Sequence, residues 1–532
     1  MKTQFHFLIL TASGLILSPA AHALDTNPPG YEQPQEVQDS TTPRFQAKLN
    51  QIQNIVVIYA ENRSFDHLYG NFPGVDGLRD LKLEQITQRD RDGSVLKELP
   101  VIWGGLTGPG VTPAITEAQT AHLPNTTFKI DAPDGFNASL SVMTRDLVHR
   151  FYQDQMQING GKSDRYVAYA DSGALVMGYY DVSKLPLWSV AQRYTLADHF
   201  FQGAFGGSFL NHLALICACT PYYPNLNKSP AASRISAVEA DGVTLKLAAN
   251  SPASALVGPP KFVNDGAFTP DFYAVNTMQP PYQPSAVKPA TGGDPRYADP
   301  SNASTLPPQT QKTIGDLLSA KGISWAWYSG AWQATLDGQN GATVPNFQYH
   351  HQPFNYFAAY APGTPERAEH LLDGGLNGEE FIKAIDAGKL PQVAFYKPQG
   401  NLNEHAGYTD VTSGDQHIAD IIAHLEKSPQ WGRMVVIVTY DENGGWWDHL
   451  APPKADRWGP GTRIPALIVS PFAKKNYVDH TPYDTTSIIR FITKRFHLRA
   501  LPGLARRDNA MAQAGEPKLG DLTDALELRG NY

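Results

Sequence analysis

Short, continuous apolar runs constrain the fold of this chain more than any other feature. They lie at residues 54–59, 393–396, 434–440 and 464–470. Uninterrupted apolar runs of this length are typical of strands buried on both faces, as in a parallel sheet. Helical patterns separate several of them: residues 417–427 have apolar side chains at helical spacing, and Asp484 is suited to cap a helix over residues 485–496. Strands that alternate with helices predict an α/β sandwich around a mostly parallel sheet.

The first 50 residues differ from the rest of the chain. Lys2, an apolar core over residues 7–17 and the small-x-small sequence Ala21-His22-Ala23 predict a secretory signal over residues 1–23. We therefore expect a periplasmic or secreted protein without a transmembrane anchor. Residues 24–50 are rich in Pro, Gln, Asn and Thr, which favours an extended arm.

Residues 51–532 are long enough for one large catalytic domain. Within them, residues 220–310 are dense in Pro, Ala, Ser, Asn and Gly and show little periodicity, so we expect an irregular cap or insertion over one end of the sheet.

Charge and cysteine content narrow the possible partners. Lys and Arg number 43 against 51 Asp and Glu, and this mild acidity argues against a nucleic-acid partner, which usually requires a basic patch. The two cysteines, Cys217 and Cys219, are too few for a zinc cage. A spacing of two is poor geometry for a disulfide inside a helix or strand, so we expect two buried thiols.

Acidic residues follow two of the expected strands. Glu61-Asn62 comes after the run at 54–59, and Asp441-Glu442 comes directly after the run at 434–440. Ligands of α/β sheets bind outside the carboxyl ends of strands, where carboxylate and amide oxygens can coordinate a hard cation. An isolated Glu-Asn pair is more often a cap or a surface turn. Adjacent carboxylates repel one another, however, and two acidic strand ends in one sheet favour a metal site.

Ser208 and four histidines are the other candidates for chemistry. Ser208 follows Gly206-Gly207 and opens a helix-like stretch, a position that favours a phosphate or an alkoxide, although a plain N-cap serine is commoner. No G-x-S-x-G sequence supports an esterase triad. Histidines that converge could bind phosphoryl oxygens or protonate a leaving group. The histidines considered are His122, His350, His351 and His405.

Two long motifs resemble a known family. The sequences NIVVIYAENRSFDHLYGNFPGVDG (54–77) and VTYDENGGWWDHLAPP (438–453) are similar to those of the bacterial phosphoesterase family of acid phosphatase A and the non-haemolytic phospholipases C. The similarity continues through GTRIPALIVSPFAKKNYVDHTPYDTTSIIRF (461–491) and covers most of residues 50 to 500. Because that family belongs to the alkaline phosphatase superfamily, the resemblance implies that α/β fold.

The resemblance also implies roles for individual residues. It implies one divalent metal ion held by Glu61, Asn62, Asp441, Glu442 and the nucleophilic hydroxyl of Ser208. It implies contacts to the phosphoryl group from His350, His351 and His405, and His122 is a looser match. We expect His351 or His405 to protonate the leaving oxygen. Oxygen ligands favour Mg²⁺, Ca²⁺ or Mn²⁺, and Fe²⁺ remains an alternative.

Three functions stay open at this point. The first is hydrolysis of small phosphate monoesters of the acid phosphatase type through a phosphoserine, which the length of the chain and its GGSFLNH sequence favour. The second is a phospholipase C acting on phosphatidylcholine-like lipids, with phospholipid head groups as substrates. The third is a periplasmic protein that binds phosphate or metal without turnover, which the presence of Ser208 disfavours.

Overall fold

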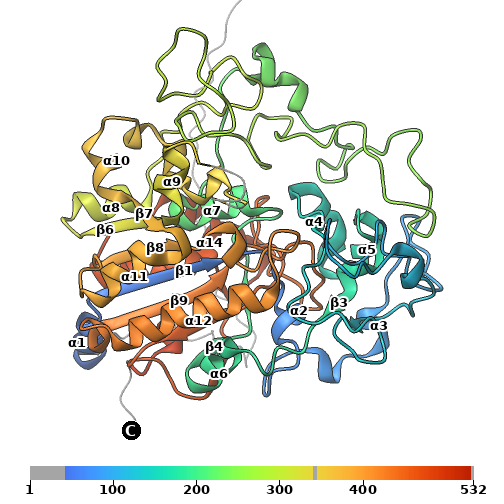
Figure 1. The fold of residues 1–532 in the computed structure, drawn as a ribbon, viewed down its shortest axis with the longest axis horizontal. Coiled ribbons are helices and arrows are strands. Elements are labelled where there is room, and N and C mark those ends of the chain that lie inside the picture. The colour runs from blue at the N-terminus through green and yellow to red at the C-terminus, as the bar shows by residue number, and fades with distance from the viewer. Residues whose placement is uncertain (1–41, 340–343, 345, 529–532) are drawn as a thin grey trace, which may run out of the picture. The chain divides into compact units, whose positions relative to one another are not determined.

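The computed structural model describes residues 42–339, 344 and 346–528. The expected signal at 1–23 and residues 24–41 of the expected arm lie outside these ranges. A compact unit that begins at Arg44 holds the sheet and the helices around it (Figure 1).

The largest sheet among the described residues has eight strands in the order β11-β4-β10-β9-β1-β8-β6-β7. All neighbouring pairs are parallel except those of β10, which runs antiparallel to β9 and β4. The four apolar runs form β1, β8, β9 and β10, which confirms the expected mostly parallel α/β sheet. The bounds are β1 Asn54–Ala60, β4 Thr195–Ala197, β6 Trp325–Gly330, β7 Leu371–Gly375, β8 Val393–Lys397, β9 Met434–Tyr440, β10 Ala466–Val469 and β11 Tyr477–Asp479.

Burial explains the composition of the central strands. Every residue of β1, β8 and β9 is buried, so both faces of the sheet are covered and the strands carry apolar side chains without alternation. Helices α6, α11 and α12 pack side by side, and Figure 1 shows α11 and α12 in front of the strands. Helix α7 packs against α13, and Tyr59 of β1 donates a hydrogen bond to Asn211 O of α7.

Helix termini follow the expected signals. Helix α13 begins after Asp484, whose side chain accepts from Thr486 N, as the sequence predicts. The principal helices are α4 Phe151–Ile158, α6 Pro186–Arg193, α7 Ser208–Cys217, α8 Ile314–Ala320, α11 Glu379–Asp386, α12 Val411–Lys427, α13 Thr485–Phe496 and α14 Pro502–Ala514. Across the described residues, every helix is too short or too polar to span a bilayer.

Two local expectations are wrong. The end of the expected arm is helical, because Phe45 and Leu49 share one buried face of α1 (Pro43–Gln51).

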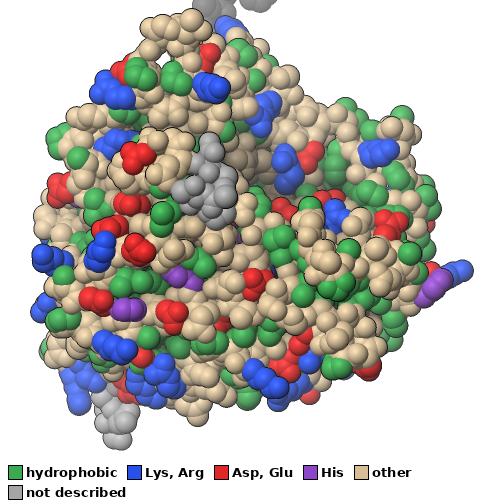
Figure 2. Space-filling view, in the orientation of Figure 1, with side chains coloured by type: hydrophobic (Ala, Val, Ile, Leu, Met, Phe, Trp, Pro, Cys, Tyr) green, Lys and Arg blue, Asp and Glu red, His purple; other side chains and the backbone are tan. Residues whose placement is uncertain are grey.

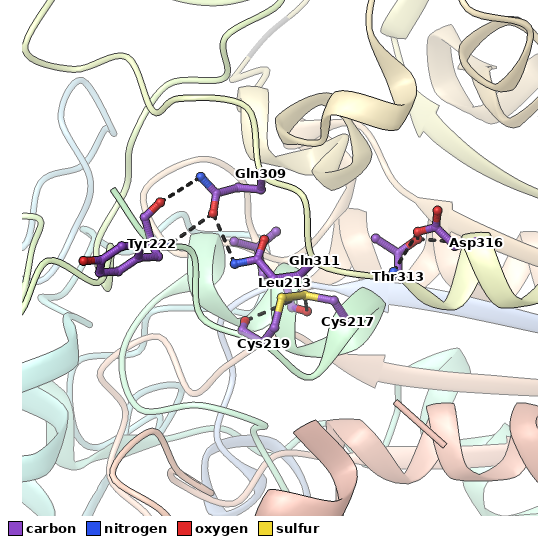
Figure 3. The surroundings of a disulfide bond; sticks show 8 residues. All are labelled: Leu213, Cys217, Cys219, Tyr222, Gln309, Gln311, Thr313 and Asp316. Carbon is purple, nitrogen blue, oxygen red and sulfur yellow. Dashed lines mark hydrogen bonds between the residues drawn. A yellow bond between two sulfur atoms is a disulfide. The ribbon is translucent and has the colours of Figure 1, made fainter. Parts of the chain in front are cut away.

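Cys217 and Cys219 form a disulfide instead of two thiols (Figure 3). Helix α7 ends at Cys217 and Ala218 adopts a left-handed conformation, so the chain reverses and the two Cα atoms lie 5.1 Å apart, inside the usual range for a disulfide.

The segment 220–310 is largely irregular, as expected. It contains the short 3₁₀ helices η5 (Leu226–Lys228) and η6 (Pro230–Arg234) and several isolated β-bridges, and Figure 1 draws it as light green loops. Phe268 and Met278 are buried in the common core, so the segment is packed against the rest of the unit. On the face shown in Figure 2, acidic and basic side chains are interspersed.

Candidate functional site

Two acidic turns meet at the carboxyl edge of the sheet. Strands β1 and β9 are parallel neighbours in a register that pairs Ala60 with Tyr440, so the residues that follow them emerge side by side. Asp441 Oδ1 accepts hydrogen bonds from the backbone N–H of Asn62 at 3.2 Å and of Glu442 at 2.8 Å. The two turns are therefore joined through one carboxylate, as expected for a site at this edge.

Glycines allow the turns to approach each other closely. A Cβ atom on Gly444 would lie 2.3 Å from Asn62 O, and Gly444 also has a positive φ. A Cβ on Gly206, another residue with positive φ, would lie 2.4 Å from the backbone nitrogen of Phe151. Neither position tolerates a side chain. The Gly-Gly sequences flanking Asp441-Glu442 and Ser208 thus set the geometry of the site.

Ser208 lies at the centre of the acidic residues. It is the first residue of α7, whose N-cap is Gly207. Its Oγ lies 3.3 Å from Glu61 Oε2, 3.4 Å from Asn62 Oδ1 and 3.4 Å from Glu442 Oε1. The structure therefore brings together the five expected metal ligands: Glu61, Asn62, Ser208, Asp441 and Glu442.

The carboxylates of this cluster outnumber the cations of the chain that lie beside them. Glu61, Asp441 and Glu442 are completely buried. Lys397 Nζ lies 2.6 Å from Glu61 Oε1, and despite burial Lys397 holds the pKa of Glu61 well below its ordinary value. Burial, reinforced by the charge of Glu61, raises the pKa of Asp441 to about 7. Burial also raises the pKa of Glu442 well above its ordinary value, against the effect of nearby His149.

The residues present fit a divalent cation. Asp441 Oδ2 is buried and, among the described residues, has no hydrogen-bond partner; Lys397 Nζ is 3.9 Å away. The separations of 3.3 to 3.4 Å between Ser208 Oγ and its three oxygen neighbours resemble those of adjacent ligands on one octahedral cation, about 3.0–3.4 Å for bonds of about 2.1–2.4 Å. An orphaned carboxylate oxygen beside converging oxygens is what a hard cation requires.

Three of the four expected histidines surround this cluster. His351 Nε2 lies 2.6 Å from Glu61 Oε1, and His405 Nε2 lies 3.9 Å from Glu61 Oε2. Burial lowers the pKa of His351 to about 4 and the pKa of His405 below its ordinary value. His350 packs edge-on against His351 and is also buried.

His122 does not join this group. Its side chain is 85% exposed, and its Nδ1 pairs with Glu98 Oε2 at 3.0 Å. It lies in a loop with a positive φ, on the surface of the unit. The expected contact between His122 and substrate is therefore not supported by its position.

A cavity of about 280 Å³ opens onto Ser208. His350 and His405 line it, whereas His351 contacts Glu61 and is not among the lining residues. The 220–310 segment supplies part of the wall through residues 275–277. Other lining residues are Glu61, Asp146, His149, Gln348 and Tyr408.

Three residues of the site did not emerge from the sequence. His149 lines the cavity with its Nε2 3.7 Å from Glu442 Oε1, and although burial opposes protonation, Glu442 and Asp146 raise its pKa to about 9. Lys397 ends β8 beside the two acidic strand ends, a signal that the sequence contained. His212 lies one helical turn after Ser208, and its Nδ1 bonds to Ser208 O at 2.8 Å. No pattern marks His149, which lies in an irregular stretch.

Comparisons with known proteins show to which family the chain belongs. The sequence pattern of the Phosphoesterase family matches residues 52–499. The chain is 23% identical over 492 residues to the non-hemolytic phospholipase C of Burkholderia pseudomallei, which covers 85% of this chain and 56% of that protein. It is 23% identical over 519 residues to phospholipase C B of Mycobacterium tuberculosis, which covers 90% and 78%.

The chain thus spans little more than half the length of the Burkholderia relative. Among solved structures, an alkaline phosphatase superfamily protein of Vibrio parahaemolyticus aligns with a TM-score of 0.31 and 11% identity, covering 69% of this chain and 72% of that one. The family pattern extends over most of the chain, and this protein belongs to the Phosphoesterase family.

Proposed function

We propose that this protein hydrolyses phosphoric esters, with Ser208 as nucleophile and one divalent metal ion held by Glu61, Asn62, Ser208, Asp441 and Glu442. The observation that carries the proposal is the position of Ser208 Oγ, within 3.4 Å of oxygens from Glu61, Asn62 and Glu442 and open to a cavity. A bound divalent cation would lower the pKa of the serine hydroxyl and draw charge from the phosphoryl group.

Side chains around the cavity supply the remaining chemistry. The Ser208 hydroxyl passes its proton to a neighbouring carboxylate such as Glu442, its Oγ attacks phosphorus in line with the departing alcohol, and a phosphoserine forms as the ester bond breaks. Of the two expected proton donors, His405 is the better placed, because it lines the cavity with Ser208 while His351 does not. His149 and His350, which also line the cavity, hold the phosphoryl oxygens. Water then attacks the phosphoserine, one of its protons returns to Ser208 Oγ, and phosphate is released.

The size of the cavity favours small monoesters as substrates. A volume of about 280 Å³ suits a phosphoryl group with a compact alcohol better than a lipid. The phospholipase C activity named for the relatives makes a diester with a phosphorylcholine head group the second candidate. We also propose export to the periplasm or medium, because the signal-like first 23 residues agree with a chain that carries a disulfide.

Chemical trapping tests the nucleophile. Wild-type protein quenched during turnover of p-nitrophenyl phosphate is expected to carry phosphate on Ser208, detectable by mass spectrometry. Ser208→Ala should show neither adduct nor turnover. Ser329→Ala, which removes a buried hydroxyl from β6, is the matched control and should behave as wild type. Metal binding without adduct or turnover in the wild type would support a non-catalytic binding protein.

Relative rates test the substrate class. Hydrolysis of p-nitrophenyl phosphate is expected to exceed hydrolysis of its phosphorylcholine ester in kcat/KM. The reverse order would reject the monoesterase and support the phospholipase C candidate.

A further inference from the structure

A second group of histidines and acids lies at the same edge of the sheet, away from Ser208. Strands β4 and β11 are parallel neighbours whose register pairs Ala197 with Asp479. The next residues, Asp198 and His480, therefore emerge side by side, and His199 follows Asp198. Asp76, from the loop after α2 (Phe65–Tyr69), approaches the same point. These four residues, Asp76, Asp198, His199 and His480, are called the β4/β11 cluster.

The donor atoms of the β4/β11 cluster converge. Ligand atoms of Asp198, His199 and His480 all lie within 4.8 Å of one another. His480 Nδ1 lies 2.9 Å from both carboxylate oxygens of Asp198, and His199 Nε2 lies 3.5 Å from Asp76 Oδ2. Two ligand atoms on one tetrahedral zinc ion are about 3.3 Å apart when the bonds to zinc are about 2.0–2.1 Å long. The distance between Asp198 and His480 therefore has to increase only slightly for the ion to bind between them.

Neighbouring residues hold the donor atoms of this cluster in position. Buried Arg463 donates through Nη1 to the backbone oxygens of Asp76 at 2.6 Å and Asp198 at 3.0 Å, which fixes the two acidic segments relative to each other. His449 Nε2 lies 3.1 Å from Asp76 Oδ1, leaving Oδ2 directed to His199. Outer partners of this kind orient metal ligands in proteins.

One ring nitrogen of the cluster makes no hydrogen bond. His199 Nε2 is buried and, within the described part of the chain, forms no hydrogen bond. Asp76 Oδ2, at 3.5 Å, is its nearest carboxylate oxygen, so this nitrogen is available to a ligand shared with Asp76. His199 also lines a cavity of about 620 Å³, together with Pro482 and Leu450, and this cavity gives an ion access from solvent.

We infer that the β4/β11 cluster is a second metal site, which binds a zinc-class divalent cation through Asp76, Asp198, His199 and His480. Two imidazoles and two carboxylates suit Zn²⁺ in tetrahedral geometry, whereas the all-oxygen set at Ser208 suits harder cations. The site has no part in the proposed reaction, and its binding of zinc does not depend on that reaction.

Zinc stoichiometry tests the inference. Intact protein dialysed against micromolar Zn²⁺ is expected to hold one more equivalent than His480→Ala or His199→Ala protein. His480 is 58% exposed, so its replacement leaves the fold intact, and His424→Ala is the matched control because His424 forms a similar exposed pair with Asp386 at 2.8 Å. His424→Ala should bind as much zinc as wild type.

A spectroscopic signature separates this site from the one at Ser208. Co²⁺ bound to the β4/β11 cluster should give the intense visible absorption of tetrahedral coordination, absent in His480→Ala. Hydrolysis of p-nitrophenyl phosphate by His480→Ala should equal that of wild type, so failure of the proposed function leaves this test unaffected. Equal zinc content in wild type and His480→Ala would overturn the inference.

Discussion

The two acidic turns of this protein contribute to two clusters that differ in how many acids and how many cations they contain. Glu61 and Asp441 belong to the cluster around Ser208, whereas Asp66 and Asp448, a few residues further along the same turns, contact Arg463. Arg463 lies 2.9 Å from Asp66 and 3.0 Å from Asp448.

His449 completes the balance of the second cluster. Its Nδ1 lies 2.6 Å from Asp66, and although burial opposes protonation, Asp66 raises the pKa of His449 to about 10. Two buried acids thus meet two cations of the chain in direct contact, and His449 also contacts the partly exposed Asp76 at 3.1 Å. Around Ser208, three buried carboxylates meet one lysine in direct contact. We infer that the balanced cluster stabilises the fold and that the unbalanced one binds a cation.

The largest effect is expected from a substitution in the unbalanced cluster around Ser208. Asp441→Asn should lower kcat/KM for phosphate esters about a thousandfold, because the metal ion loses a charged ligand while the amide oxygen can still accept the hydrogen bonds that join the two turns. The metal-free variant should unfold in urea at the same or a higher concentration than metal-free wild type, since one of three repelling carboxylates is neutralised. Asp415→Asn, another buried acid, is the control and should retain activity. A marked loss of metal-free stability in Asp441→Asn would contradict the charge argument.

The corresponding change in the balanced cluster should have the opposite result. Asp66→Asn leaves Arg463 and His449 short of a partner in the interior, and we expect a loss of about 3–5 kcal/mol of unfolding free energy. Activity per folded molecule should remain near wild type. Urea unfolding combined with a p-nitrophenyl phosphate assay measures both, and a stable but inactive Asp66→Asn would show that the two clusters are not separate.

A smaller effect concerns pH. The folded pKa of His449, about 10, lies above its ordinary value near 6.5, so its stabilising contribution is complete below about pH 6.5 and is lost as pH rises toward 10. The stability difference between wild type and His449→Gln should therefore shrink over that interval. Chemical unfolding at several pH values checks this, and a difference that grows with pH would reject the protonated state of His449.

The smallest effect is expected at the disulfide. Cys217 and Cys219 are two positions apart, and closing so short a loop restricts the unfolded chain little, worth about 1.5 kcal/mol. A Cys217→Ala/Cys219→Ala variant should lose about this much stability and retain activity. A loss of activity would show that the end of α7 also controls the position of Ser208.

Site residues could be predicted from the sequence where acidic residues come directly after an expected strand. Glu61 and Asp441 follow buried apolar runs, and parallel register then brings them together without further information. His149 comes from an irregular stretch whose path depends on packing against Gly206 and Gly207, so no local pattern reveals it. His122 is the opposite case. A histidine is easily matched to a family by sequence, but only the fold decides which histidines meet at the site, and His122 lies exposed on the surface. The disulfide was missed because its formation depends on the left-handed conformation of Ala218, whereas the prediction assumed that both cysteines lie in one regular helix or strand.

Metal content and hydrolysis, measured on the same sample, show whether the cluster around Ser208 works with a bound cation. The measurement uses His480→Ala protein, from which the proposed zinc site is absent, so that the remaining metal reports on the cluster at Ser208. We expect one divalent ion per chain. Metal and activity should be lost together on chelation or when Asp441→Asn is combined with His480→Ala, and added cation should restore both to the chelated protein. Full hydrolytic activity in protein that holds no metal would contradict this expectation.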